Sequence, residues 1–273
     1  MIYRTHIPPP PLGQFIECVW FFSGYMPDQP RERILPDGTS ELIINLQDVP
    51  RKLFDAEGPG RHRSFRGAWL SGPSSEPMVI DALPDSSLMG ARFRPGGLAP
   101  FLREPVGEVA NQVVELDQLW GASANRMREQ LLEEATPESR IARLERILLG
   151  ILGRRAADPV AMRALAMFEE APPFSARVET VAEELGFSHK HFVARFRGAV
   201  GLTPKLYCRL LRFRRALEAV HSRPEVDWAE VALESGYYDQ AHFNRDFREF
   251  SGLTPSAYGA LRGDEAKFVP VPE

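Results

Sequence analysis

Two stretches of the chain, residues 181–204 and residues 231–255, carry nearly the same sequence. The first reads VAEELGFSHKHFVARFRGAVGLTP and the second reads VALESGYYDQAHFNRDFREFSGLTP. Val-Ala, a glycine, His-Phe, a second phenylalanine and Gly-Leu-Thr-Pro recur in the same order, at an offset of 50 residues before the glycine turn and 51 after it. A repeated unit of this size predicts that one supersecondary structure is built twice.

Each copy has the pattern of a helix-turn-helix. A short helix ends at Gly186 or Gly236, because glycine adopts the left-handed conformation of a C-cap without strain. An N-cap residue, Ser188 or Asp239, then begins a second helix that carries phenylalanines four residues apart on one face. In this arrangement the first helix supports the second, whose N-terminal side chains can enter the major groove of DNA.

The pattern between the two copies predicts one long helix over residues 204–222, which begins with Pro204 after the N-cap Thr203. It spans ~28 Å, slightly less than one ~34 Å turn of DNA, so it can hold two recognition helices over successive segments of the major groove. Its arginines either neutralise phosphates or form an ordinary solvated face. The apolar stripe of this helix consists of Leu206, Leu210, Phe213, Leu217 and Val220, and the arginines are Arg209, Arg212 and Arg215.

These motifs resemble the C-terminal DNA-binding domain of AraC/XylS-type transcription regulators, in which a long helix joins two helix-turn-helix units. The second copy carries the resemblance most specifically, with DQAHF and F..F.G.TP..Y in the expected order over 23 residues. The resemblance covers residues 177–262. A weaker one covers LPDGTSELIINL (35–46), GARFRPGG (90–97) and LDQLWG (116–121), which are similar to the sensor-like domain of an uncharacterised branch of that family. That branch implies a fold but no ligand.

The resemblance places Lys190, Val193 and Ala194 of the first recognition helix where family members contact bases. Many members have arginine at the position of Ala194 and an apolar residue at the position of Arg195. This departure leaves two roles for Arg195, a phosphate contact or an ion pair with a nearby carboxylate. The predicted phosphate contacts are His189, Arg195, Arg209, Arg212 and Arg215.

The second recognition helix is chemically richer. Gln240 can form a bidentate contact with adenine and Arg245 with guanine, each worth ~1–3 kcal/mol of discrimination. His242 and Asn244 lie beside them and are also predicted to reach base edges. Because His191 and His242 occupy equivalent positions, a structural role for both histidines stays open beside base contact.

The first 172 residues predict an antiparallel β-sandwich or cupin-like domain with flanking helices, so the chain as a whole is expected to be α+β. Short β-prone segments such as IECVWFF and ELIINL are separated by Gly, Pro, Ser and Asp. Helical spacing follows over residues 122–170, which form either a dimerisation surface or ordinary packing against the β-domain. An all-α domain is predicted for residues 173–263, with units at 178–201 and 228–252, and a tail for residues 264–273.

Arg92 and Arg94 alternate on one predicted strand before a glycine-rich turn, and they can hold an anionic effector. The other candidate pocket residues are Trp20, Asp37, Asn45 and Trp69, although a tryptophan in a small β-domain commonly belongs to the core. The first 174 residues contain two histidines, His6 and His62, far apart in sequence, so no metal site is predicted. With no nucleophile or phosphate-loop motif either, neither enzymatic activity nor a cofactor is predicted.

Composition fits a globular protein, with 44% apolar and 26% charged residues among 273. The net charge of −4 by itself argues against nucleic-acid binding, but residues 175–263 hold 13 Lys and Arg against 11 Asp and Glu. The clustering of basic residues therefore matters more than their sum. Two cysteines, Cys18 and Cys208, and the lack of a secretory signal or an 18-residue apolar run predict a cytoplasmic protein with no membrane contact.

The predicted function is a sequence-specific transcription regulator, activator or repressor, whose N-terminal domain binds a small-molecule effector. Its predicted partners are double-stranded DNA, the effector, a second copy of the chain and RNA polymerase. One alternative keeps DNA binding but makes the N-terminal domain a ligand-free module for dimerisation or protein docking. A second, an enzyme with an appended DNA-binding domain, has no candidate catalytic residues in the sequence.

Overall fold

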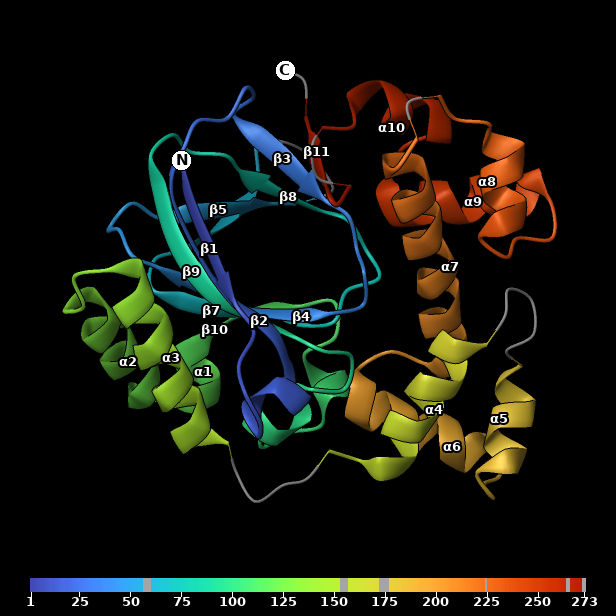
Figure 1. The fold of residues 1–273 in the computed structure, drawn as a ribbon, viewed down its shortest axis with the longest axis horizontal. Helices are drawn as coiled ribbons and strands as arrows, with labels where there is room; N and C mark the ends of the chain where they lie inside the picture. The colour runs from blue at the N-terminus through green and yellow to red at the C-terminus, as the bar shows by residue number, and fades with distance from the viewer. Residues whose placement is uncertain (56–59, 153–156, 172–176, 224, 264–265, 272–273) are drawn as a thin grey trace.

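The computed structural model describes residues 1–55, 60–152, 157–171, 177–223, 225–263 and 266–271. The two β-sheets lie on one side of the molecule and the helices of the C-terminal half lie on the other (Figure 1). Among these helices, the long helix α7 (Pro204–His221) connects the group before it in the chain to the group after it. Among the described residues, no helix is both long enough and apolar enough to span a bilayer.

Both sheets consist of antiparallel strands, which confirms the predicted two-sheet architecture. The six-stranded sheet has the order β1 (Ile2–His6), β2 (Ile16–Tyr25), β9 (Ser86–Phe93), β4 (Ser40–Asn45), β7 (Ala68–Ser71) and β10 (Val113–Glu115). The five-stranded sheet has the order β11 (Phe268–Pro270), β3 (Arg31–Ile34), β8 (Met78–Asp81), β5 (Arg51–Phe54) and β6 (His62–Phe65). Single-turn helices η1 (Leu12–Gln14), η2 (Ala99–Phe101) and η3 (Val106–Glu108) lie in the connections.

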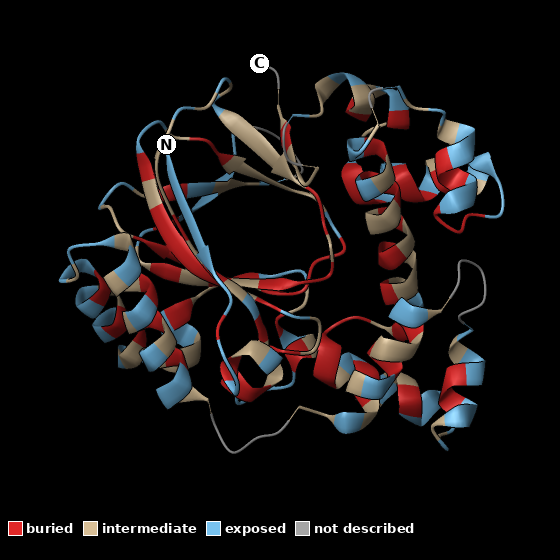
Figure 2. Cartoon of the chain, viewed as in Figure 1, coloured by how far each residue is buried: buried red, intermediate tan, exposed pale blue. Residues whose placement is uncertain are grey.

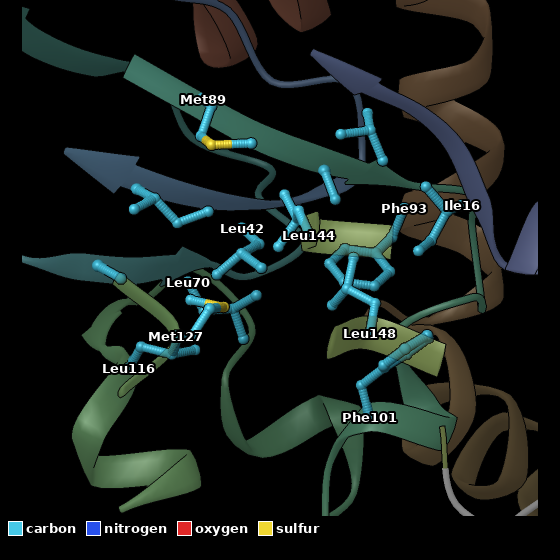
Figure 3. Packing of buried hydrophobic residues seen from close by; sticks show 14 of the residues in the cluster. Ile16, Leu42, Leu70, Met89, Phe93, Phe101, Leu116, Met127, Leu144 and Leu148 are labelled. Atoms are coloured by element: carbon cyan, nitrogen blue, oxygen red, sulfur yellow. The ribbon is translucent and has the colours of Figure 1, made fainter. Parts of the chain in front are cut away.

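The main core lies between the six-stranded sheet and the helices α1 (Leu116–Trp120), α2 (Ala122–Leu132) and α3 (Pro137–Ile151). Side chains alternate across a strand, so Val19 and Phe21 of β2 are buried in this core while Trp20 and Phe22 lie on the other face. Figure 3 shows the interdigitated side chains of this core. The packing of α2 and α3 on the sheet is one of the two alternatives predicted for these helices.

Helix α4 (Pro159–Glu170) does not pack with α2 and α3, although the sequence placed all three in one group. Its buried residues Ala161, Ala164, Leu165 and Phe168 join a cluster with Phe192 and Phe196 of α6 (His189–Val200). The rings of Phe168 and Phe196 meet edge to face at 5.9 Å. The predicted domain boundary at residue 172 lies outside the described residues, but α4 contributes to the core of the first helix-turn-helix unit.

The two helix-turn-helix units are present as predicted. The first pairs α5 (Val178–Glu184) with α6, and the second pairs α8 (Trp228–Glu234) with α9 (Gln240–Ser251). Gly186 and Gly236 end the first helix of each unit with φ angles of +76° and +87°, values that suit glycine. A short helix, α10 (Pro255–Leu261), follows the second unit.

Strand β11 was not predicted, because the sequence indicated only a tail after residue 263. It follows α10 and pairs with β3, so the chain returns to the five-stranded sheet of the first domain after completing the second unit (Figure 1). A three-residue strand carries too short a pattern to be recognised by periodicity, and its partner lies more than 200 residues away in sequence.

Candidate nucleic-acid interface and interdomain pocket

The first turns of α6 and α9 are open to solvent (Figure 2). Lys190 and Ala194 are exposed on α6, as are Gln240 and Arg245 on α9, whereas Val193, His242 and Asn244 are half-buried. The side chains of Lys190, Gln240 and Arg245 form no hydrogen bond or ion pair with any residue that the structure describes. Their polar groups can therefore reach an external partner.

The opposite ends of the same helices face the first domain. Gly201, at the C-terminus of α6, is so close to the first domain that an added Cβ would lie 2.6 Å from Cγ of Pro73. At the C-terminus of α9, a Cβ on Gly252 would lie 3.9 Å from Cζ of Arg33. The first domain thus supports both recognition helices from behind and leaves their N-terminal turns accessible.

The two equivalent histidines make equivalent contacts. His191 lies edge-on to Phe187 with ring centroids 5.4 Å apart, and His242 lies edge-on to Tyr237 at 5.2 Å. Nε2 of His242 is also 3.7 Å from the carboxylate of Asp246. The repeated ring contact supports the structural alternative for both histidines, in which each fixes the turn against its recognition helix.

The two predicted N-caps differ. Asp239 accepts a hydrogen bond from the amide of His242 at 2.7 Å, so the predicted cap of α9 is confirmed. Ser188 occupies the N-cap position of α6, but its side chain accepts no capping hydrogen bond. The predicted capping bond of Ser188 is therefore wrong.

The arginines predicted to contact phosphates are engaged inside the molecule. Arg195 donates to Asp158 at 2.7 Å, which favours the ion-pair alternative over a phosphate contact. Arg215 donates to the backbone carbonyl of Glu169 at 3.1 Å. Arg212 lies 5.5 Å from the ring centroid of Tyr237. His189, by contrast, is exposed, with Nε2 3.8 Å from Glu179.

Arg209 is the most strongly bound arginine of this group. It donates to Glu249 at 2.6 Å and to the buried Asp246 at 2.8 Å. The hydrogen bonds to Glu249 and Asp246 raise the pKa of Arg209 above its usual range, and the same contact lowers the pKa of Glu249. A buried carboxylate such as Asp246 needs a cation, and α7 supplies one from the face for which the sequence predicted either phosphate contacts or exposure to solvent.

Two exposed side chains near the second recognition helix were missed by the sequence analysis. Tyr238 is 86% exposed and occupies the turn before α9, where the second unit has its extra residue. Arg248 is also exposed, one helical turn after Arg245 on α9. The longer turn of the second unit was a signal for Tyr238. Tyr237 fills the buried aromatic position of the turn, so the additional residue, Tyr238, is left exposed.

A cavity of about 510 Å³ lies between the first domain and the helices. Glu17, Asp37 and Arg92 line it from the β-domain, Met162 and Leu165 from α4, and Arg214 and Leu217 from α7. Lys267, which precedes β11, completes the wall. Three of the predicted effector residues, Asp37, Arg92 and Arg94, therefore meet at one site.

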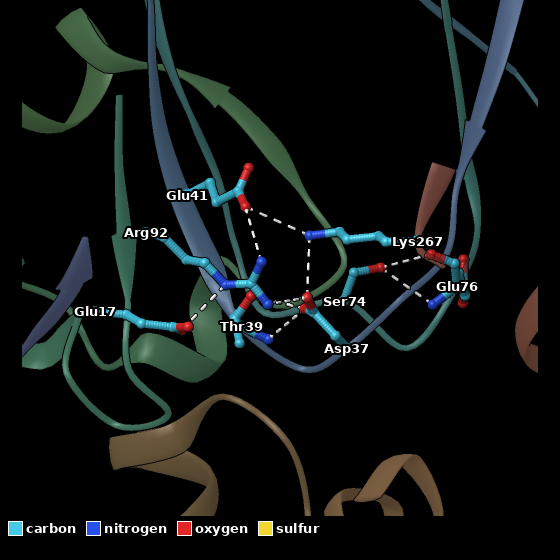
Figure 4. Close-up of polar contacts among 8 residues, drawn as sticks. All are labelled: Glu17, Asp37, Thr39, Glu41, Ser74, Glu76, Arg92 and Lys267. Atoms are coloured by element: carbon cyan, nitrogen blue, oxygen red, sulfur yellow. Dashed lines mark hydrogen bonds and ion pairs between the residues drawn. The ribbon is translucent and has the colours of Figure 1, made fainter. Parts of the chain in front are cut away.

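Asp37 is the centre of an ion-pair network at this cavity (Figure 4). Its Oδ2 atom accepts from Nη2 of Arg92 at 2.6 Å and lies 3.0 Å from Nζ of Lys267. Its Oδ1 atom accepts from the amide and the hydroxyl of Thr39 at 3.0 and 2.7 Å. Burial alone would raise the pKa of Asp37, but Lys267, Arg92 and the Thr39 hydrogen bonds outweigh it and hold that pKa well below its usual range.

Two further carboxylates share these cations. Arg92 lies 3.2 Å from Glu17 and 3.8 Å from Glu41, and Nζ of Lys267 lies 3.4 Å from Glu41. Burial lowers the pKa of Arg92 and of Lys267, but the neighbouring carboxylates, Asp37 foremost, outweigh it and raise both values. The network thus holds both cations in the charged state.

Two other cations at the cavity have no carboxylate partner among the described residues. The side chain of Arg94 donates to the backbone carbonyl of Gly13 at 3.0 Å, and the side chain of Arg214 forms no hydrogen bond or ion pair with the residues that the structure covers. Arg214 and Lys267 were missed by the sequence analysis, because each comes from a segment far from the β-domain in sequence.

The remaining effector candidates have structural roles away from the cavity, so their predicted grouping with Asp37 is not supported. Asn45 is fully buried, donates to the carbonyl of Val49 at 2.8 Å and accepts from the amide of Gln47, which fixes the turn after β4. Trp20 stacks on Phe22 with centroids 5.9 Å apart. Trp69 packs against Phe65 at 5.5 Å. Within the described part of the chain, no group of His, Cys, Asp and Glu is arranged to hold a metal ion.

Comparison with known protein families gives two matches. A model described as a helix-turn-helix domain matches residues 181–260. A model described as a domain of unknown function, DUF6597, matches residues 4–115. The first match covers both repeated units, and the second covers most of the two sheets.

The chain is also similar to individual proteins. It is 33% identical over 84 residues to a probable transcription factor, PqrA from Proteus vulgaris, a match that spans 30% of this chain and 66% of that relative. ToxT from Vibrio cholerae is 11% identical, with a TM-score of 0.47 over 94% of this chain and 97% of that structure. The DNA-binding domain of AdpA, solved with a target DNA, is 28% identical, with a TM-score of 0.35 over 38% of this chain and 91% of that structure.

Proposed function

We propose that this chain, which belongs through its C-terminal domain to the AraC-type helix-turn-helix proteins, is a sequence-specific DNA-binding transcription regulator. The observation that carries the proposal is the repeated unit itself. Two recognition helices on one rigid connector both expose their first turns, and unpaired polar side chains stand on each. Regulation of transcription places such a protein with DNA in the cytoplasm, and we propose no catalytic activity for it.

We propose that the second unit supplies most of the sequence specificity. Gln240 and Arg245 carry the groups that form bidentate contacts with adenine and guanine, and both are exposed without a hydrogen-bond partner among the described residues. Tyr238 adds an exposed ring at the start of the same helix. The other predicted base contacts are Lys190, Val193, Ala194, His242 and Asn244.

Fewer residues are proposed to contact phosphates than the sequence predicted. His189 keeps this role, because it is exposed at the first turn of α6. Arg195 and Arg209 instead position the recognition helices, the first by joining α6 to the start of α4 and the second by joining α9 to α7. A positioning role predicts that their loss weakens binding through the geometry of the helices, with little change in the salt dependence of binding.

We propose that the cavity between the domains binds a small anionic effector with an apolar part. Arg94 and Arg214 supply cationic groups without carboxylate partners among the described residues, and Met162 and Leu165 supply an apolar wall. A ligand there would contact the β-domain, α4 and α7 together. Its binding energy can then depend on how the domains are placed, which an effector requires in order to shift a conformational equilibrium.

One observation favours the alternative of a ligand-free first domain. Arg92 and Lys267 already have carboxylate partners, so part of the cavity's charge is neutralised by the protein itself. A ligand-free domain of this kind can serve as a dimerisation or docking module, with a second copy or RNA polymerase as partner. On α2 and α3, the exposed side chains of Leu132 and Leu149 are apolar groups that such a contact can use.

Selection from a pool of random duplex DNA tests the proposed function. We expect the wild-type chain to enrich one motif and the double variant Gln240→Ala/Arg245→Ala to relax part of it, with an affinity loss of ~1–3 kcal/mol per contact. Lys205→Ala is the matched control, because it removes an exposed positive charge from α7. Failure of the wild-type chain to enrich any motif, with and without candidate effectors, would overturn the proposal.

A further inference from the structure

Strand β11 joins the segment that follows the second helix-turn-helix unit to the sheet of the first domain. Its register with β3 pairs Phe268 with Ile34 and Val269 with Arg33. Backbone hydrogen bonds continue beyond the strand, from the amide of Leu35 to the carbonyl of Lys267 at 2.9 Å and from the amide of Val271 to the carbonyl of Arg31 at 3.0 Å. The segment therefore covers an edge that would otherwise be unpaired.

The same segment is fixed to the second unit by side-chain contacts. Val269 is completely buried in the cluster that contains Phe250 and Tyr258 of the second unit and Leu35 of the first domain. The hydroxyl of Tyr258 donates to the carbonyl of Ala266 at 2.9 Å. One short segment thus contributes its backbone to the first domain and its apolar side chain to the core of the second unit.

Lys267 adds an ionic contact to this connection. Its ammonium lies 3.0 Å from Asp37 and 3.4 Å from Glu41, both in the β-domain (Figure 4). Asp37 is only 12% exposed, so the pair is shielded from water. If Lys267 is removed, Asp37 keeps Arg92 as a partner but loses its ionic contact with the segment before β11.

We propose that residues 266–271 are a clasp that couples the second helix-turn-helix unit to the five-stranded sheet, and that opening of this clasp releases the second recognition helix from the first domain. The family matches end at residues 115 and 260, so neither assigns a role to this segment. The consequence for DNA binding rests on the proposed function, whereas the coupling itself rests on the contacts alone.

The length of the connection makes the coupling tight. Helix α10 ends at Leu261 and β11 begins at Phe268, so at most ~25 Å of extended chain separates them. While β11 is paired, the second unit cannot move far from the sheet. The first unit contacts the β-domain elsewhere, through Gly201 against Pro73, so the clasp acts directly on the second unit and on the first unit through α7.

The clasp also shares a residue with the cavity. Lys267 lines the cavity while it pairs with Asp37. An anion in the cavity would compete with Asp37 for this ammonium and would weaken one of the contacts that keep the clasp closed. Occupancy of the cavity and release of the second unit are then linked through one side chain.

Hydrogen exchange of the full chain, measured by mass spectrometry, tests the clasp without DNA. We compare the wild type with Lys267→Ala, which removes the ion pairs, and with Val269→Ala, which shortens the buried side chain. Both variants should exchange at least ~10 times faster in peptides covering residues 31–35 and in peptides covering α8 and α9. Peptides of β1 and β2 should be unchanged, and Lys205→Ala should match the wild type throughout.

Two results would overturn the clasp. Unchanged exchange at residues 31–35 in both variants would mean that β11 does not hold the edge of β3. Faster exchange at residues 31–35 with unchanged α8 and α9 would mean that β11 is an edge strand without coupling. A selection experiment that yields no DNA motif would remove the proposed function and leave this exchange experiment as valid as before.

Discussion

At the scale of single residues, Asp37 joins two cations that come from distant parts of the chain. Its carboxylate joins a turn of the β-domain to Arg92 on β9 and to Lys267 next to β11. We expect Asp37→Asn to lower the free energy of unfolding by ~2–3 kcal/mol near pH 7, because Arg92 and Lys267 each lose one of their carboxylate partners. Urea unfolding followed by circular dichroism measures this difference.

The depressed pKa of Asp37 fixes how that difference depends on pH. The stabilisation is fully present above the pKa of an unfolded aspartate, ~3.9, and is lost as the pH falls through the lower pKa of the folded state. The difference in the free energy of unfolding between the wild type and Asp37→Asn should therefore be constant from pH 7 to pH 5 and should decrease below pH 4. A difference of the same size at pH 3 would contradict the assignment of the stabilisation to the charged carboxylate.

Gly201 offers a second prediction at this scale, with a matched control in the same unit. Both Gly201 and Gly186 have positive φ angles, +92° and +76°, so alanine is strained at either position by ~1 kcal/mol or more. A Cβ at Gly201 would also lie 2.6 Å from Pro73, whereas none of the described atoms lies within 4 Å of one at Gly186. Thermal unfolding should show a larger loss for Gly201→Ala, and equal losses would exclude a tight contact between α6 and the β-domain.

At the scale of elements, α4 belongs energetically to the first helix-turn-helix unit. Phe168 is buried against Phe196 and Tyr207, so Phe168→Ala should cost ~3–5 kcal/mol. Hydrogen exchange should then become faster in α5 and α6, with α2 and α3 unaffected. The matched control is Leu148→Ala, which opens the core under the six-stranded sheet and should give the reverse pattern. Loosening of α2 by Phe168→Ala would place α4 with the first domain instead.

How well each element was predicted follows from how local its determinants are. The helix-turn-helix pattern could be recognised from the sequence, because Gly186, Gly236 and the Thr-Pro pairs mark helix ends within a few residues of chain. The position of α4 and the existence of β11 depend on partners far away in sequence, for which a single sequence carries no signal. The arginines of α7 follow the same rule, since Arg209 is fixed by Asp246 on another helix.

The residues of the candidate cavity follow the same rule, because those with a local signal in the sequence were predicted and those brought in by distant segments were not. Arg92 and Arg94, which line the cavity, were predicted from their alternation on one strand, which is a local signal, and Asp37 was one of the further candidates. Lys267 and Arg214 reach the cavity from α7 and from the segment before β11, which only the folded chain brings together. Trp20 and Asn45 were wrongly grouped with the cavity, because composition alone does not distinguish a pocket residue from a core or turn residue.

At the scale of the whole molecule, the cavity is the place where the β-domain, α4, α7 and the clasp meet. A ligand bound there should stabilise the native state as a unit, by ~2.7 kcal/mol at a concentration 100 times its Kd. We expect small carboxylates with an apolar part, tested as benzoate and hexanoate, to raise the melting temperature, and hexylamine to leave it unchanged. The double variant Arg94→Ala/Arg214→Ala should abolish the response, because it removes the two cations without carboxylate partners.

The control for this measurement is Arg248→Ala, which removes an exposed arginine from α9, away from the cavity lining. It should respond to the carboxylates as the wild type does. If the wild type also responds to hexylamine, the effect is not selective for anions and the cavity's cations do not determine it. If no carboxylate stabilises the chain, the internal ion pairs of Arg92 and Lys267 neutralise enough of the cavity's charge to prevent anion binding. That result would contradict the effector proposal and support the alternative in which the first domain binds no ligand.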